Sequence, residues 1–362
     1  MSEHRTDLSS RTLLFVGSYN TPVPHAPQAH GRGIEILELD FDAKEAGSRL
    51  VDKEVEQPSY IYFDARRHTL YAVSELWGGG EGTVSALSLD EACSKVTKRT
   101  TLGTGGTVPC YASLLEDRYL LVANYGDGSL ATFALAQDGQ LESRTSVLRF
   151  SGRGPNAERQ GGPHAHCILP HTNGLVYATD LGTDNVYRYW ANLGDGSLDL
   201  VGQTNLPPGS GPRHMRFLSS GNLAVLVLEL SSHLAVFEVA GTGELVQQAY
   251  LSLLPPDFQG ESFGADVVVS NDGRHVYATN RGHDSVVTFQ VDPATGKTAQ
   301  VGWQPCGGKT PRSLALDPSG HRLVVANQDS DNIKVFNVGE TGKIEPAFSI
   351  PVPTPVCVKF TA

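Results

Sequence analysis

The sequence predicts an all-β protein, a seven-bladed β-propeller with four antiparallel strands in each blade. One reason is a motif, usually opening on proline, that recurs seven times in 362 residues at intervals of roughly 50, a period typical of repeat architectures. Each interval holds short runs rich in Val, Tyr, Phe and Thr, without helical periodicity. The chain also has 39 Gly and 21 Pro, many of them between these runs, as expected for turns.

The seven openings mark the first strand of each blade. They read Pro58-Ser59-Tyr60, Pro109-Cys110-Tyr111, Pro163-His164-Ala165, Pro212-Arg213-His214, Gly264-Ala265-Asp266, Pro311-Arg312-Ser313 and Pro355-Val356-Cys357. In the clearest repeat we expect strands over residues 110–115, 119–124 and 129–135, with a fourth strand around Leu148. Polar and Gly-rich turns separate these runs, which is the pattern of an antiparallel blade.

The two ends of the chain together supply the remaining blade. Residues 356–360 provide only an opening strand, while the N-terminal part provides strands at 13–18, at 33–39 and near 51–55. We therefore expect the C-terminal strand to join the N-terminal strands and close the ring, which removes most exposed sheet edges.

Composition and charge limit the possible functions. We expect residues 1–362 to form a single domain, with residues 1–11 as a disordered tail. A net charge of -11, without any run of Lys or Arg, argues against nucleic acid and against anionic membranes. The apolar run 12–16 is too short for a signal peptide, and no stretch could span a membrane, so we expect a cytoplasmic protein. Five widely spaced cysteines without a CxxC indicate neither disulfides nor zinc.

Aligning the blades on their openings gives columns, and residues that depart from a column are candidates for chemistry. The residue after the opening is Ser59, Cys110, His164, Arg213, Ala265, Arg312 or Val356. Two positions further on lie Ile61, Ala112, His166, Met215, Val267, Leu314 and Val358. The second strand closes on Ser18, Glu75, Asn124, Asp180, Glu229, Asn280 or Asn327. The next residue is Tyr19, Leu76, Tyr125, Leu181, Leu230, Arg281 or Gln328.

The polar exceptions gather in consecutive blades. They are His164 and His166, then Arg213, His214 and Glu229, then Asn280, Arg281 and His283. Because the first strands of a propeller line its channel, these side chains should converge at one mouth of the ring. Arginine binds carboxylate or phosphate, and Glu and His are the usual proton-transfer groups. The set predicts a metal-independent acid/base site for a small anion.

The strongest candidates each have a structural alternative. His166 could be a satisfied core histidine, since this residue type has no fixed preference for burial. Arg213 and Arg281 could instead bridge blades through Asp180 or Glu229.

Two further features concern a possible metal site and two loops. His164 and His166 could begin a metal site, but no third ligand follows at the usual spacing, so we expect neither metal nor cofactor. The loops 21–32 and 152–162 are too rich in Pro or Gly to form strands and could border the site.

Six stretches carry a specific resemblance to a known family. They are GPHAHCILP (162–170), YATDLGTDNVYRY (177–189), GPRHMRF (211–217), LELSS (228–232), SNDGRHVYATNRGHDSV (270–286) and DPSGHRLVVANQDSDNI (317–333). The chain resembles the seven-bladed lactonase family, which includes 6-phosphogluconolactonases and 3-carboxy-cis,cis-muconate lactonizing enzyme. By motif match, the resemblance implies catalytic roles for His166, Arg213, Glu229 and Arg281. We expect the surrounding substrate-binding residues to be His164, His214, Asn280, His283, Glu75 and Asn327.

The resemblance implies a metal-independent lactonase that hydrolyses a sugar lactone or phospholactone such as 6-phosphogluconolactone. The same arginines and acid/base groups could serve a muconate-type cycloisomerase, and a non-catalytic binding platform is a further alternative. The segment 75–80 and the long loop 21–32 depart from what the family leads us to expect, and both could reshape the channel mouth. The partner is in each case a small anionic lactone or carboxylate.

Overall fold

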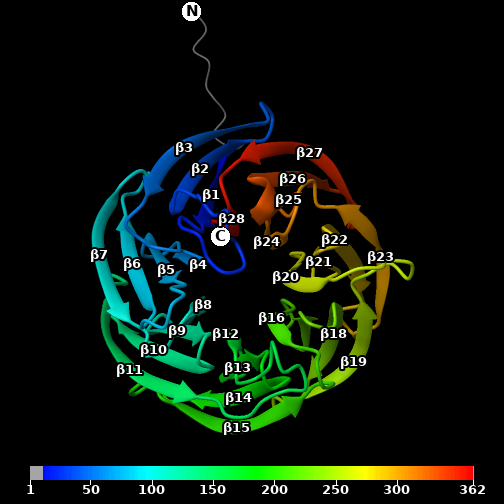
Figure 1. The fold of residues 1–362 in the computed structure, drawn as a ribbon, viewed down its shortest axis with the longest axis horizontal. Coiled ribbons are helices and arrows are strands. Elements are labelled where there is room, and N and C mark those ends of the chain that lie inside the picture. The colour runs from blue at the N-terminus through cyan, green and yellow to red at the C-terminus, as the bar shows by residue number, and fades with distance from the viewer. Residues whose placement is uncertain (1–10, 362) are drawn as a thin grey trace, which may run out of the picture.

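The computed structural model describes residues 11–361 and contains seven four-stranded sheets arranged as blades around a central channel (Figure 1). In six blades the strands follow one another in chain order from the channel outward, with antiparallel neighbours. The predicted fold class, including four strands per blade, is therefore confirmed. Within residues 11–361, no helix has the length and apolar character needed to cross a membrane.

The strand bounds follow the predicted repeats closely. Three blades are β4 (Tyr60–Asp64), β5 (Thr69–Ser74), β6 (Thr83–Leu89) and β7 (Val96–Gly103); β8 (Pro109–Leu115), β9 (Tyr119–Asn124), β10 (Ser129–Leu135) and β11 (Leu141–Arg149); and β12 (Ala165–Pro170), β13 (Leu175–Asp180), β14 (Asn185–Ala191) and β15 (Leu198–Asn205). Three more are β16 (Pro212–Phe217), β17 (Leu223–Leu228), β18 (His233–Val239) and β19 (Leu245–Ser252); β20 (Phe263–Val269), β21 (His275–Arg281), β22 (Ser285–Val291) and β23 (Thr298–Pro305); and β24 (Pro311–Leu316), β25 (Arg322–Asn327), β26 (Asn332–Val338) and β27 (Ile344–Pro351).

The last blade joins the two ends of the chain. It consists of β28 (Pro355–Phe360), β1 (Arg11–Ser18), β2 (Ile34–Asp40) and β3 (Glu45–Asp52), in that order, so the predicted ring closure is confirmed. The strand expected near 51–55 was wrong in its bounds. The side chain of Asp52 accepts hydrogen bonds from the backbone N–H groups of Glu54 and Val55, which turns the chain out of the sheet. Of the tail predicted at 1–11, residues 1–10 lie outside the described part and Arg11 begins β1.

Packing between blades explains the long apolar runs in the sequence. Every residue of β5, β9, β13 and β17 is buried, because neighbouring blades cover both faces of these strands. Three tyrosines in second strands also bond to a turn in the next blade. Their hydroxyl groups donate to the carbonyl oxygens of Gly139, Gly243 and Gly342, from Tyr71, Tyr177 and Tyr277, at 2.7–3.0 Å. All three glycines have positive φ, a conformation that strains other residues.

Candidate active site

A cavity of about 460 Å³ occupies one mouth of the channel. Its walls come from the inner strands, from the ends of second strands, and from the loops 21–32 and 152–162. The lining residues are Pro24, His25, Glu75, Trp77, Cys110, Tyr125, Glu158, Arg159, His166, Arg213, Glu229, Phe263, Arg281 and Arg312. All four predicted catalytic residues, and Glu75 among the predicted substrate-binding residues, therefore lie together.

β-Bulges at the start of the inner strands direct side chains into the channel. In β8, β12, β16, β20, β24 and β28 the register shifts near the first residue, which leaves one residue more than the partner strand can pair. A bulge of this kind re-aims a side chain and is common beside active sites. The bulge column, completed by the residue before β4, is Ser59, Cys110, His166, Arg213, Ala265, Arg312 and Val356. All of these except Ala265 line the channel.

This register corrects the alignment of one blade on its proline. The strand β12 opens at Ala165 rather than at Pro163, because Ala165 is its first paired residue. Consequently His166, and not His164, occupies the bulge column together with Arg213. His166 stands out among apolar residues when the blades are aligned on their prolines, but in the structure its column also holds Ser59, Arg213 and Arg312.

A second correction concerns the carboxylates. Leu228 and Ser74 are the last residues of their strands to pair with the third strand, so Glu229 and Glu75 lie one position further on, level with Arg281. This post-strand column is Tyr19, Glu75, Tyr125, Leu181, Glu229, Arg281 and Gln328. Four of its members line the cavity, whereas none of the residues one position earlier does.

Glu229 is the centre of a cluster of arginines. Nη2 of Arg159 donates a hydrogen bond of 2.6 Å to Oε1. Oε2 lies 3.0 Å from Nη2 of Arg281 and 3.1 Å from Nε of Arg213. Neither of these two contacts is aligned as a hydrogen bond, and within residues 11–361 both Nε groups lack a hydrogen-bond partner. Nε2 of His166 lies 3.9 Å from the same carboxylate oxygen.

The charges of this cluster fix its protonation. Burial alone would raise the pKa of Glu229, but Arg281, Arg159 and Arg213 hold it well below its ordinary range. Burial lowers the pKa of Arg281 to about 10 and also lowers that of Arg213, and both guanidinium groups stay charged at neutral pH. Glu229 is therefore a fixed counter-ion rather than a group poised to exchange a proton near neutral pH.

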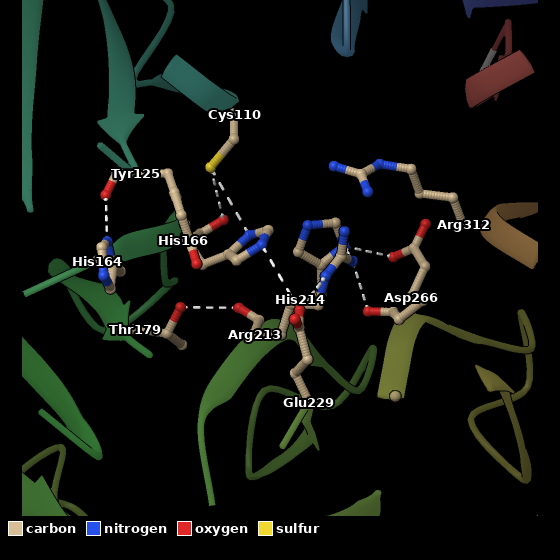
Figure 2. A network of polar contacts seen from close by, with 12 residues as sticks. Cys110, Tyr125, His164, His166, Thr179, Arg213, His214, Glu229, Asp266 and Arg312 are labelled. Atoms are coloured by element: carbon tan, nitrogen blue, oxygen red, sulfur yellow. Dashed lines mark hydrogen bonds and ion pairs between the residues drawn. The ribbon is translucent and has the colours of Figure 1, made fainter. Parts of the chain in front are cut away.

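Two imidazoles lie side by side near the cavity floor (Figure 2). The ring centroids of His166 and His214 are 5.2 Å apart. Burial, and then the charge of Arg213, lower the pKa of His166 well below its ordinary value and that of His214 to about 3, so both rings are neutral at pH 7. Nδ1 of His214 lies 2.7 Å from Oδ1 of Asp266. His214 lines a smaller inner chamber rather than the cavity itself.

A second carboxylate, Glu75, lines the cavity from another blade. Its Oε1 accepts hydrogen bonds of 2.8 Å from the hydroxyl of Tyr19 and 3.1 Å from Nε1 of Trp77. The same oxygen lies 3.9 Å from Nη2 of Arg312 and 3.9 Å from Nε2 of His25. The cavity thus contains two buried carboxylates, each with its own set of partners.

Aromatic rings form one side of the cavity. The ring of His25 lies 5.2 Å from that of Tyr19 and 5.3 Å from that of Trp77, and Trp77 lies 6.5 Å from Tyr125. Rings in this arrangement present an apolar surface beside the charged groups.

The other four predicted substrate-binding residues do not line the cavity. Asn280 accepts a hydrogen bond from Ser262, and Asn327 donates one of 3.1 Å to the backbone oxygen of Cys306, so both hold the connections between blades in place. Nδ1 of His283 lies 2.7 Å from the hydroxyl of a serine two residues later. The ring of His164 is stacked on that of Tyr125, with 4.4 Å between the ring centroids, and Nδ1 of His164 lies 2.8 Å from the backbone oxygen of Tyr125.

Several cavity residues were missed by the sequence argument. Arg312 carries a visible signal, because it shares the bulge column with Arg213 and is just as exceptional there. Arg159 and His25 lie on the two loops that were expected to border the site, but loop residues have no repeat column to depart from. With histidines neutral, four arginines and three glutamates line the cavity, which leaves it with a net charge of +1 in a chain of net charge -11.

Metal ligation finds no support in the arrangement of side chains. Within the described residues, no group of three or more His, Cys, Asp or Glu side chains is placed to hold a metal ion.

The seven-bladed propeller of this chain matches a known protein family. The family model described as "Lactonase, 7-bladed beta-propeller" matches residues 13–360, and the chain belongs to this family. It is 34% identical to a 6-phosphogluconolactonase of Bacillus subtilis over 352 residues, covering 96% of this chain and 97% of the relative. It is 30% identical to a 6-phosphogluconolactonase of Formosa agariphila, covering 92% and 94%.

Solved structures agree with this assignment. The periplasmic gluconolactonase of Pseudomonas aeruginosa superposes with a TM-score of 0.89 at 32% identity, covering 98% of this chain and 99% of the other. The protein is thus a lactonase-family propeller similar to 6-phosphogluconolactonases.

Proposed function

We propose that the protein hydrolyses the lactone of a small anionic sugar acid in this cavity. The observation that carries the proposal is the convergence of four arginines on one cavity in an otherwise acidic protein. Such a site attracts an anion locally, although the field of the whole protein repels it. The buried Nε–H of Arg281 has no hydrogen-bond partner within residues 11–361, and that of Arg213 faces Oε2 of Glu229 at 3.1 Å without the alignment of a hydrogen bond.

The arginines supply the electrostatic part of catalysis. One guanidinium binds the acid group of the substrate, and a second polarises the ester carbonyl, where negative charge develops during attack by water. Glu229 holds Arg159, Arg213 and Arg281 in place through its ion pairs. Proton transfer is assigned to the imidazoles of the cavity floor, with His166 in contact with the lactone, because Glu229 is held ionised by its arginines.

The substrate class follows from the charge of the cavity and from the names of relatives. A phosphorylated sugar lactone, as acted on by relatives named 6-phosphogluconolactonase, would pair its phosphate with the arginines. The similar protein named gluconolactonase implies a lactone without phosphate. The excess of arginine over glutamate in the cavity favours the phosphorylated compound.

A kinetic comparison tests the proposal. Proton release from 6-phosphoglucono-δ-lactone and from glucono-δ-lactone is followed at neutral pH with EDTA present, after subtraction of spontaneous hydrolysis. We expect Arg213→Ala to lose about 100-fold or more in kcat/KM, in line with the loss of one oxyanion-stabilising donor. Arg144→Ala is the matched control, because Arg144 pairs with Glu81 outside the cavity.

Two results would overturn the proposal. The first is wild-type activity in Arg213→Ala. The second is the absence of activity on both lactones, in which case cyclisation of 3-carboxy-cis,cis-muconate, or binding without turnover, becomes the better hypothesis.

A further inference from the structure

A small chamber adjoins the floor of the cavity, deeper in the channel. Its volume is about 10 Å³, close to the size that admits one water molecule. Five residues line both spaces, so the chamber lies directly against the place where the lactone is proposed to bind. They are Glu75, Cys110, His166, Arg213 and Arg312.

Four side-chain atoms in the wall of this chamber are buried without a hydrogen-bond partner within residues 11–361. One of them, Nε of Arg213, lies 3.1 Å from Oε2 of Glu229 in an ion pair. The other three are Oγ of Ser59, Oε2 of Glu75 and Nε2 of His214. Each residue is more than nine-tenths buried. Leaving a buried polar atom unpaired costs about 1–3 kcal/mol. Three such atoms around one small space therefore indicate a ligand that satisfies all of them.

The hydrogen-bonding roles of these atoms match a water molecule. Nδ1 of His214 lies 2.7 Å from Asp266, whose pKa burial would raise but His214 and nearby cations hold well below its ordinary value. Nη1 of Arg213 also lies 3.2 Å from this nitrogen, but the ionised Asp266 is the closer partner and assigns the ring proton to Nδ1, which leaves Nε2 as an acceptor. Glu75 Oε2 is a second acceptor, and the Ser59 hydroxyl can donate.

Water supplies two donors for these two acceptors and accepts one hydrogen bond from serine, about the three contacts usual for a buried water. One lone pair of its oxygen remains free. A monovalent cation fits less well, because an imidazole nitrogen is a poor ligand for it and the guanidinium groups of Arg213 and Arg312 line the same chamber.

We propose that this chamber binds one water molecule and that this water is the nucleophile of the reaction. The inference rests on the proposed lactone hydrolysis. The free lone pair forms the new bond to the carbonyl carbon, while the proton of the water passes to Nε2 of His214. The proton is then carried through the adjacent His166 to the ring oxygen as the ring carbon–oxygen bond breaks. The products are the carboxylate, after loss of its acid proton to solvent, and a free hydroxyl group.

Ser59→Ala is the sharpest variant for testing this assignment. It removes only a hydroxyl that has no partner within the described residues, so it should not lower the stability of the fold. Ser18→Ala is the matched control, because Ser18 is also buried with an unpartnered Oγ but does not line the chamber. We expect kcat of Ser59→Ala to fall about tenfold, the loss of one hydrogen bond to the reacting water, with KM unchanged. Ser18→Ala should match the wild type in both constants.

His214→Gln tests the acceptor of the proton. Glutamine keeps a polar side chain but cannot take up the proton, so we expect a fall of about 100-fold in kcat with little change in KM. Equal kcat in the wild type and in both chamber variants would overturn the inference. A loss carried by KM alone would do so as well, since it would assign the chamber to substrate binding.

A crystal structure at atomic resolution gives a readout that does not depend on activity. We expect ordered water within about 3.2 Å of Ser59 Oγ, Glu75 Oε2 and His214 Nε2 in the wild-type protein. A chamber without water at that resolution would overturn the inference even if lactonase activity is found. Water in the chamber together with inactivity on every lactone would overturn the proposed function, and with it the nucleophilic role, while leaving the water site itself in place.

Discussion

Replacing Glu229 with glutamine tests whether this residue holds the arginine cluster together. Glutamine can still offer one oxygen to Arg159, but its amide NH₂ would then face Arg281 and Arg213, whose nitrogens lie 3.0 and 3.1 Å from Oε2. The N–H groups of the amide would then face the N–H groups of these two arginines, and all three guanidinium groups would lose their shared negative charge. Removing one partner of a buried ion pair costs about 3–5 kcal/mol, and we expect a loss of that size.

Urea denaturation with and without inorganic phosphate measures the effect. Phosphate should restore part of the lost stability, by about 2.7 kcal/mol at one hundred times its dissociation constant, because the uncompensated arginines bind it. Glu158→Gln is the control, since Glu158 lines the same cavity but is exposed, and its effect should stay within about 0.5 kcal/mol. A Glu229→Gln protein within 1 kcal/mol of the wild type would refute the reasoning.

The same substitution has a defined pH signature. Because the folded-state pKa of Glu229 is depressed, its contribution to stability is fully present above its ordinary pKa of 4.5 and is lost as the pH falls through the folded value. Between neutral pH and pH 3, the wild type should therefore lose more stability than Glu229→Gln. Parallel curves would contradict the depressed pKa.

Three further outcomes are expected. Deletion of residues 355–362 removes β28, whose two buried valines contribute about 3–6 kcal/mol to the free energy of unfolding. This deletion should lower the melting temperature of the whole ring, whereas deletion of only the last two residues should leave it unchanged. Trp77→Ala removes a ring from the cavity wall and should raise KM for a sugar lactone about 5- to 30-fold with kcat little changed; an unchanged KM would place the sugar elsewhere. Tyr277→Phe removes the hydroxyl that bonds to Gly342 in the next blade, and should cost about 1 kcal/mol by denaturation without affecting KM.

The fold was predictable because its determinants repeat. A run such as residues 119–124 is apolar up to its closing residue, Asn124, which indicates a strand covered on both faces, and six near-copies of it fix the number of blades. The one strand that was misplaced, β3, lies on the outer edge, where most residues are exposed and the apolar pattern that locates inner strands is missing. Its end is fixed instead by a turn at Asp52, a local hydrogen-bonding effect that the repeat does not encode.

The candidate site was predictable in part, for the same reason. His166, Arg213 and Arg281 occupy positions where other blades carry different residues, so comparison between blades finds them. Arg159 lies on a loop that occurs once, and no such comparison could have assigned it to the carboxylate of Glu229. Asn280 and Asn327 were chosen as polar residues that close a second strand, but both are hydrogen-bonded to connections between blades and neither lines the cavity.

The geometry of the blade explains why only two columns carry the chemistry. A bulge at the start of six of the seven inner strands breaks the alternation of side chains, so the extra residue, except Ala265, faces the channel instead of the neighbouring blade. The post-strand residue lies beside it, just beyond the last pair with the third strand, where the ladder no longer determines the direction of the side chain. Every blade contributes one residue to each column, and the other inward-facing side chains of the blade pack against the neighbouring blades. Changes of substrate within this architecture should therefore arise first in these two columns and in the loops 21–32 and 152–162, because these parts of the chain supply most of the residues that line the cavity.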